Sequence, residues 1–127
     1  PSARARELYA IALASLRAGM QAAIPGVDVS AVEEASLVPL RAHGLEHTAM
    51  MRFGYGVGIA YPPVWLETLQ IARGFPYRLQ PGMAFVLHSC LELPDEQLGV
   101  IQGGTWVMTG QGLRLLAGAG DCDLQVL

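Results

Sequence analysis

The chain has 127 residues, enough for one domain with a real core, and 52% of them are apolar. Only 15% are charged, below the roughly 25% of ordinary globular proteins. We interpret this shortage as surface that packs against another segment or a second subunit; a compact alanine-rich domain is the alternative. The net charge of −3 and the scattered basic residues argue against nucleic-acid binding.

Membrane insertion and secretion are not indicated. No apolar run approaches the roughly 20 residues of a membrane span, and no charged region followed by an apolar region resembles a signal peptide. The two cysteines, Cys90 and Cys122, are too few for a disulfide framework and lack metal-ligand spacing. We therefore expect a cytoplasmic protein. Because the sequence begins with Pro1, we expect a fragment or a processed product.

The first predicted helix follows Ser2, a plausible N-cap. Apolar residues recur at helical spacing from Leu8 to Ala23, which predicts an amphipathic helix of about six turns. Pro25 cannot continue the hydrogen-bond ladder and Gly26 accepts a left-handed turn, so the helix is expected to end there.

A second helix is predicted over residues 31–43. Ser30 and Glu33 have the spacing of a capping box, in which each side chain accepts from a free N–H at the helix start. Gly44 is the expected stop. Pro39 lies inside the segment, which predicts either a kink or an earlier end near Val38.

Strands are predicted from residue 54 onward. Glycines alternate with larger residues over 54–58, which indicates an extended segment that approaches another group closely. Pro81-Gly82 forms a turn before a buried strand, Met83–Leu91. Two further strands are expected at 100–101 and 105–109, and a hairpin turn at 110–112 leads to a strand at 113–116. The order of elements predicts an α+β fold with helices on one face of a sheet, in one domain.

Three segments in this order carry a resemblance to a known family. Residues 54–58 (GYGVG) resemble its GHGIG strand, residues 81–88 (PGMAFVLH) resemble PGMVFTIE, and residues 103–112 (GGTWVMTGQG) resemble EDTVLVTEDG. With the two helices, the chain resembles the C-terminal half of the pita-bread domain of creatinase, prolidase and methionine aminopeptidase. The resemblance implies half of a pita-bread fold, two helices packed on a curved antiparallel sheet. Residues 1–127 would then be the C-terminal part of a creatinase/aminopeptidase-like catalytic domain.

The resemblance also implies that metal-ligand positions are lost. Metal-dependent members hold two divalent ions with two aspartates, which would lie upstream of Pro1, one histidine and two glutamates. Tyr55 stands at the position of the histidine, His88 at that of the first glutamate and Gly103 at that of the bridging glutamate. A neutral phenol is a poor ligand at neutral pH, glycine offers none, and a lone histidine cannot hold two dications. We therefore expect no metal and no other cofactor.

The creatinase branch is similar in two further places. Residues 52–56 resemble its Phe-Gly-Tyr-Gly strand, and residues 61–67 resemble a PPxW(x)E stretch of ectoine-hydrolase-like and Xaa-Pro-dipeptidase-like relatives. Creatinase has this fold, uses no metal and cleaves a C–N bond of a small substrate by acid–base chemistry. Pro62 and Pro63 stand in the region where prolidase has a second histidine and a glutamate.

Two residues are candidates for catalysis. His88 could act as general acid or base near neutral pH; the alternative is a core histidine bonded to a backbone carbonyl. Tyr55 could donate to a substrate carboxylate or an oxyanion; the alternative is a side chain that fills the volume left by absent metals. We interpret Cys90 as a small buried hydrophobe.

Four further residues are candidates for substrate binding. Arg52 could pair with a carboxylate, or form an ordinary ion pair. His47 could line the mouth of the pocket, as could the neighbouring His43 to a lesser extent, or both could simply be solvated. Trp65 and Glu67 could cover the pocket, or pack as an ordinary loop.

Three functions remain open at this point. The first is a metal-independent hydrolase of C–N bonds in a small amidine, amide or imino-acid substrate, inactive until the N-terminal half of the same domain completes the pocket. The second is an Xaa-Pro dipeptidase or aminopeptidase-type metallopeptidase relative. The third is a non-catalytic binding module. By resemblance to the creatinase branch, a homodimer is expected.

Overall fold

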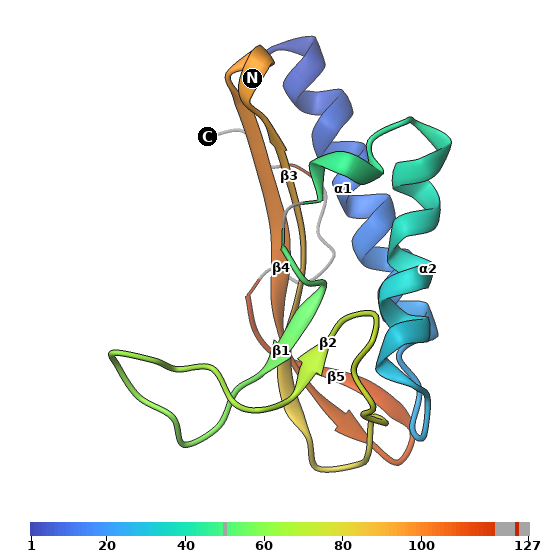
Figure 1. Cartoon of the computed structure of the whole chain (residues 1–127), viewed down its shortest axis with the longest axis vertical. Helices are drawn as coiled ribbons and strands as arrows, with labels where there is room; N and C mark the ends of the chain where they lie inside the picture. The colour runs from blue at the N-terminus through green and yellow to red at the C-terminus, as the bar shows by residue number, and fades with distance from the viewer. Residues whose placement is uncertain (50, 119–123, 125–127) are drawn as a thin grey trace.

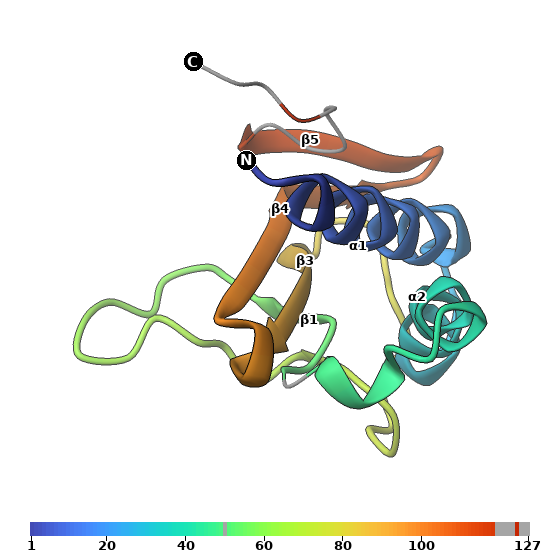
Figure 2. The same ribbon diagram turned by 90° about the horizontal axis from the view of Figure 1, so that it is seen from above.

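The computed structural model describes residues 1–49, 51–118 and 124, and this part of the chain contains nine helices and strands. In chain order they are α1 (Ala3–Ala22), α2 (Val29–Ala42), the 3₁₀ helix η1 (Glu46–Thr48), β1 (Gly54–Gly56), β2 (Gln70–Ile71), β3 (Ala84–Leu93), the 3₁₀ helix η2 (Pro94–Glu96), β4 (Leu98–Thr109) and β5 (Gly112–Gly118). The strands form one open antiparallel sheet in the order β2-β1-β3-β4-β5. Both long helices lie on the same face of this sheet (Figures 1 and 2). This confirms the predicted α+β arrangement of two helices on an antiparallel sheet.

The two helices begin differently. Ser2 caps α1 as predicted, since its hydroxyl accepts from the backbone N–H of Ala5 at 3.1 Å. The capping box predicted for α2 is wrong. Asp28 is the N-cap and accepts from the N–H of Ser30 at 2.8 Å, while the carboxylate of Glu33 is engaged elsewhere. Asp28 stands directly before the first helical residue, Val29, and has the extended backbone conformation that an N-cap needs.

Pro39 does not end α2, so of the two predicted alternatives the earlier end near Val38 is wrong. The helix continues to Ala42. A proline in a helix removes one hydrogen bond and crowds the carbonyl four residues earlier, but the turns on both sides of Pro39 are held by buried apolar residues. Leu37 and Leu40 pack into a cluster with residues of α1 and β3, and this burial offsets the lost hydrogen bond.

The core lies between the helices and one face of the sheet. Alternate residues of β3, Phe85, Leu87 and Leu91, are fully buried against this helical layer. Trp106 of β4 joins them and is only 2% exposed. Gly19 of α1 allows the ring of Phe53 to lie directly on the helix backbone, because a Cβ at position 19 would be 2.2 Å from that ring. The side chain of Phe53 therefore packs the segment before β1 against α1.

β3 and β4 form one long hairpin. The two separate strands predicted at 100–101 and 105–109 are a single strand, and Gly103 and Gly104 pair with β3 without a break. Glycine weakens a strand but does not remove backbone hydrogen bonds, so ten consecutive pairs form across the hairpin. Of the extended segment predicted over residues 54–58, only residues 54–56 form a strand, β1.

Residues 57–68, which we call the arm, project from the sheet between β1 and β2 (Figures 1 and 2). Backbone hydrogen bonds close its base: Gly56 and Leu69 are joined at 2.9 Å, and Glu67 and Gly56 at 3.1 Å. Its outer part is apolar and exposed, with Ile59 99% accessible. None of the helices in the described part of the chain is long and apolar enough to span a membrane.

Candidate functional site

The candidate site lies on the face of the sheet that the helices leave bare. Side chains alternate along β3; since Phe85 and Leu87 face the helices, Val86 and His88 face the other way. The register of the sheet then places Tyr55 of β1 opposite Val86 and Gly103 of β4 opposite His88. The structure thus brings together the three positions at which the resemblance implied lost ligands.

The rings of Tyr55 and His88 are in direct contact. Their centroids are 5.7 Å apart with an interplanar angle of 60°, an edge-to-face arrangement. His88 is only 5% exposed, and neither ring nitrogen has a hydrogen-bond partner among the described residues. The alternative of a core histidine bonded to a carbonyl is therefore not what this structure shows.

The surroundings of His88 favour the neutral form of its imidazole. Burial lowers its pKa below the ordinary value of 6.5, and the positive charge of Arg52 lowers it further. A neutral imidazole carries one N–H donor and one acceptor nitrogen. Both ring nitrogens are buried, and a buried polar group without a partner costs about 1–3 kcal/mol, so a rearrangement that gives either nitrogen a partner is favoured.

Arg52 lies at the edge of the same face. Its guanidinium donates to the side-chain oxygen of Gln70, a residue paired with Tyr55 across β1 and β2. Within the described residues it forms no ion pair with a carboxylate. Arg52 therefore retains donors that a negatively charged ligand could use.

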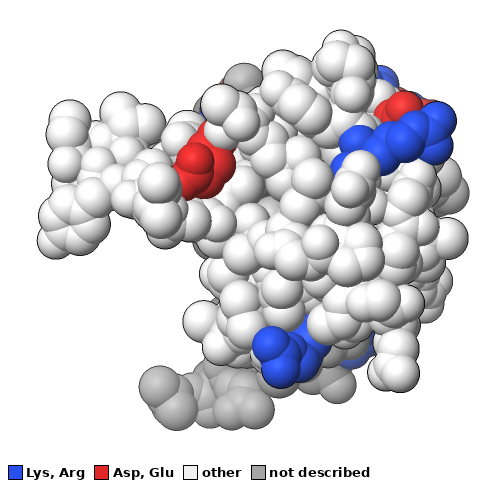
Figure 3. Space-filling view, turned by 90° about the horizontal axis from the view of Figure 1, so that it is seen from below, with Lys and Arg blue, Asp and Glu red and all other residues white. Residues whose placement is uncertain are grey.

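Tyr55, His88 and Gly103 border an open groove of about 410 Å³, and Arg52 is not among the residues that line it. The side of the molecule seen from below is hollowed between the arm and the body, and an acidic side chain lies where the two meet (Figure 3). The side chains and backbone that line the groove come from β1, β3, β4 and β5: Tyr55, Val86, His88, Ile101, Gln102, Gly103, Gly104, Thr105, Ala117 and Gly118.

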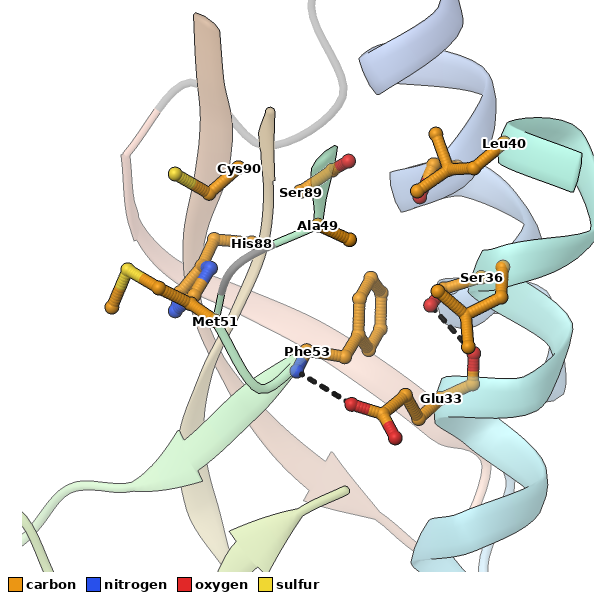
Figure 4. Close-up of a pocket in the computed structure, with 11 residues that line it drawn as sticks. Glu33, Ser36, Leu40, Ala49, Met51, Phe53, His88, Ser89 and Cys90 are labelled. Carbon is orange, nitrogen blue, oxygen red and sulfur yellow. Dashed lines mark hydrogen bonds between the residues drawn. The ribbon is translucent and has the colours of Figure 1, made fainter. Parts of the chain in front are cut away.

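A second, much smaller cavity lies on the helical side of His88. Its volume is about 20 Å³, which exceeds the 10–15 Å³ or so that one water molecule needs. Ser36, Phe53, Ser89 and Cys90 are among the residues around it (Figure 4). His88 thus borders both the water-sized cavity and the open groove.

Gly103 has a steric role. A Cβ at this position would lie 2.4 Å from the carbonyl oxygen of Leu87 and 2.7 Å from the Cβ of His88. β3 and β4 are therefore too close at this point for any side chain at position 103 unless the backbone moves.

None of the four predicted substrate-binding residues lines the groove; Arg52 is bonded to Gln70, and the other three lie elsewhere. His47 is exposed in η1 and borders two surface hollows elsewhere. Trp65 lies exposed on the arm. Glu67 lies at the base of the arm, where its carboxylate accepts from the N–H of Ala60 at 3.0 Å. His43, also exposed, contacts the carbonyl oxygen of Pro39 through Nδ1 at 2.9 Å.

Sequence reasoning overlooked Thr105 and misjudged Cys90. Thr105 pairs with Val86 and lines the groove; the alternation of β4 from Gly103 onward would have indicated it once the register was known. Cys90 is half-buried rather than buried, and it lies on the same face as His88. Burial and the neighbouring Glu92 raise the pKa of its thiol. Cys122 lies outside the described residues.

Comparison with known proteins identifies the family. The model of metallopeptidase family M24 matches residues 1–115. The chain is 34% identical over 106 residues to the uncharacterized hydrolase/peptidase y4tM of Sinorhizobium fredii, a match that covers 83% of this chain and 26% of that protein. The chain therefore belongs to metallopeptidase family M24, as the resemblance implied.

Solved structures agree on the fold. Dipeptidase PepE from Mycobacterium ulcerans superposes with a TM-score of 0.85 at 26% identity, over 95% of this chain and 31% of that one. Prolidase from Pyrococcus furiosus superposes with a TM-score of 0.82 at 23% identity, over 91% of this chain and 33% of the prolidase chain. The chain thus spans about a quarter to a third of the length of these proteins, and it has the fold of half a pita-bread domain.

The family name raises the question of a metal. In the described part of the chain, no group of three or more histidine, cysteine, aspartate and glutamate side chains is placed to hold an ion. At the groove, Tyr55 offers a neutral phenol, His88 a single imidazole, and Gly103 no side chain and no room for one. The wall that these residues form does not by itself fit a metal centre.

Proposed function

We propose that this chain forms one wall of the active site of a metal-independent hydrolase, which cleaves a C–N bond in a small amidine, amide or imino-acid substrate. One observation carries the proposal: the buried imidazole of His88, with both nitrogens unpartnered among the described residues, lies against Tyr55 beside an open groove. Such a group is expected where protons are transferred to and from a ligand.

The residues of the groove suggest how hydrolysis would proceed. The acceptor nitrogen of His88 takes a proton from a water molecule as its oxygen adds to the carbon of the C–N bond. The imidazolium then gives this proton to the departing nitrogen, so one water is consumed and His88 returns to its neutral form. The hydroxyl of Tyr55 and the guanidinium of Arg52 hold the negative part of the substrate.

The second candidate is a metallopeptidase of the Xaa-Pro dipeptidase or aminopeptidase type. Its support is the family and the names of two similar structures, a dipeptidase and a prolidase. Elemental analysis of the purified full-length protein separates the two candidates. We expect less than one equivalent of transition metal and activity that survives dialysis against a chelator. Two metal equivalents with activity that the chelator abolishes would establish the metallopeptidase.

The role of His88 is tested by substitution. We expect His88→Ala to abolish hydrolysis of a substrate found by screening creatine, ectoine and proline dipeptides. His43→Ala, an exposed histidine away from the groove, should leave the rate unchanged. Hydrolysis that persists in His88→Ala would remove this residue from the mechanism. Ligand binding without turnover of any screened compound would favour a non-catalytic binding module.

Partners and location complete the proposal. The charge-poor surface supports an upstream half of the same domain that closes the groove, and a second copy that forms a homodimer. A cytoplasmic location is consistent with the two-cysteine composition. Sedimentation of the full-length protein tests the dimer.

A further inference from the structure

Three buried serines line the small cavity between the helices and β3. Ser15 belongs to α1, Ser36 to α2 and Ser89 to β3, and their exposed fractions are 1%, 2% and 4%. Ser36 approaches the cavity from α2 and Ser89 from β3 (Figure 4). The pattern of each element would place an apolar residue there: Ser89, for example, lies between Leu87 and Leu91 on the side of β3 that faces the helices.

These hydroxyls match the hydrogen-bonding groups of a water molecule. The hydroxyl of Ser36 donates to the backbone carbonyl of Glu33 at 2.6 Å, so it meets the cavity as an acceptor. The hydroxyls of Ser15 and Ser89 can each donate or accept. A water molecule offers both donors and acceptor sites, and a water bound inside a protein typically makes about three hydrogen bonds.

The size and the charge of the cavity argue against other ligands. Its volume of about 20 Å³ is close to the 10–15 Å³ or so that one water molecule needs and leaves no room for an organic molecule. Glu33 is the one acid among its lining residues, and its carboxylate oxygens already accept from the N–H groups of Phe53 and Arg73 at 3.3 and 2.6 Å. The Nε of Arg73 also lies 3.3 Å from this carboxylate. A cation in the cavity would therefore be a buried charge without a counter-ion of its own, which is costly.

We propose that the cavity is a binding site for a single water molecule, which the hydroxyls of Ser15, Ser36 and Ser89 hold and which bridges α1, α2 and β3. The water satisfies three hydroxyls inside the apolar layer and ties β3 to both helices directly beside His88. The inference does not depend on a reaction at the groove, since an inactive protein would hold the same water.

A crystal structure of the full-length protein, at a resolution that shows ordered water, tests the site directly. We expect one water within about 2.5–3.0 Å of at least two of the three serine oxygens. A side chain that fills the cavity, or a cavity without electron density, would overturn the proposal.

A double-mutant cycle tests whether the serines share one ligand. Ser36→Ala and Ser89→Ala are made singly and together in the full-length protein, and native-state hydrogen exchange of the β3 amides reports how often the strand opens. We expect each single change to speed exchange at least about threefold, because a buried hydroxyl or the water loses a partner. The double change should have an effect at least about threefold smaller than the product of the two, because one water couples the two hydroxyls.

Ser30 supplies the matched control, because it lies in the first turn of α2 and does not line the cavity. The effects of Ser30→Ala and Ser89→Ala on exchange should simply multiply. If the effects of Ser36→Ala and Ser89→Ala multiply as well, the two hydroxyls act independently and the shared water is overturned.

Discussion

The close contact at Gly103 predicts a local intolerance to side chains. A methyl group there would press on the Leu87 carbonyl at 2.4 Å, whereas a Cβ on Gly110, in the turn after β4, meets nothing within 4 Å. We expect Gly103→Ala to lower the free energy of unfolding by about 1–3 kcal/mol and Gly110→Ala to change it by less than about 0.5 kcal/mol. Urea denaturation of both variants measures the difference. Equal effects would show that the hairpin adjusts freely at position 103.

The charge state of His88 gives a second prediction at this scale. Burial and then Arg52 lower its pKa below 6.5. Since the unfolded chain binds this proton more readily, the folded state loses stability as the pH falls through 6.5 toward the folded pKa, and the loss ends below that value. Arg52→Gln removes only the smaller cause, so we expect the pKa to rise part of the way. An NMR titration of the His88 ring measures it, with Arg78→Gln as control. An unmoved midpoint in Arg52→Gln would contradict the assigned cause.

Among the elements, α2 is fastened to the sheet by one buried carboxylate. Glu33 accepts from the N–H of Arg73 at 2.6 Å and from that of Phe53 at 3.3 Å. Glu34, the next residue, is exposed and pairs with Arg41 instead. We expect Glu33→Ala to cost about 1–3 kcal/mol of unfolding free energy, because two inward-facing N–H groups lose their acceptor. Glu34→Ala should have a much smaller effect, since exposed ion pairs contribute little.

Thermal and urea unfolding of these two neighbouring variants give the comparison. Equal losses of unfolding free energy in Glu33→Ala and Glu34→Ala would mean that Glu33 contributes no more than an exposed charge does. Hydrogen exchange of the Arg73 amide adds a local readout, since it should lose protection in Glu33→Ala and keep it in Glu34→Ala.

The role of Glu33 also shows what could be predicted from sequence at the scale of elements. Helical periodicity located both helices, and the order of motifs placed Tyr55, His88 and Gly103 on neighbouring strands. The capping box failed because the same carboxylate also fits long-range N–H donors 20 and 40 positions away, a choice that no local pattern records. The prediction of two separate strands around Gly103 and Gly104 failed for a related reason, because pairing with β3 overrides local propensity and makes β4 continuous.

At the scale of the whole molecule, the two faces of the sheet differ in how they are covered. The helical face holds both apolar clusters, while the other face carries the groove with a few exposed apolar residues such as Ile101. This asymmetry gives a physical reason for the low charge content. A surface that another segment or subunit covers needs apolar groups at its centre rather than charges. The position of Trp65 and Glu67 on the arm could not be predicted, since nothing in a Pro-Pro loop states which way it projects.

The two tryptophans report on these two environments and allow them to be tested together. Trp106 is 2% exposed within the helical core, and Trp65 is 55% exposed on the arm. We expect Trp106→Ala to lower the free energy of unfolding by about 3–5 kcal/mol, because it leaves a large cavity, and Trp65→Ala to change it by less than about 0.5 kcal/mol. In Trp65→Ala the remaining emission should be blue-shifted and protected from acrylamide. Strong protection of Trp65 in the full-length protein, with normal quenching in this chain alone, would show that the arm is covered by the part of the protein that completes the groove.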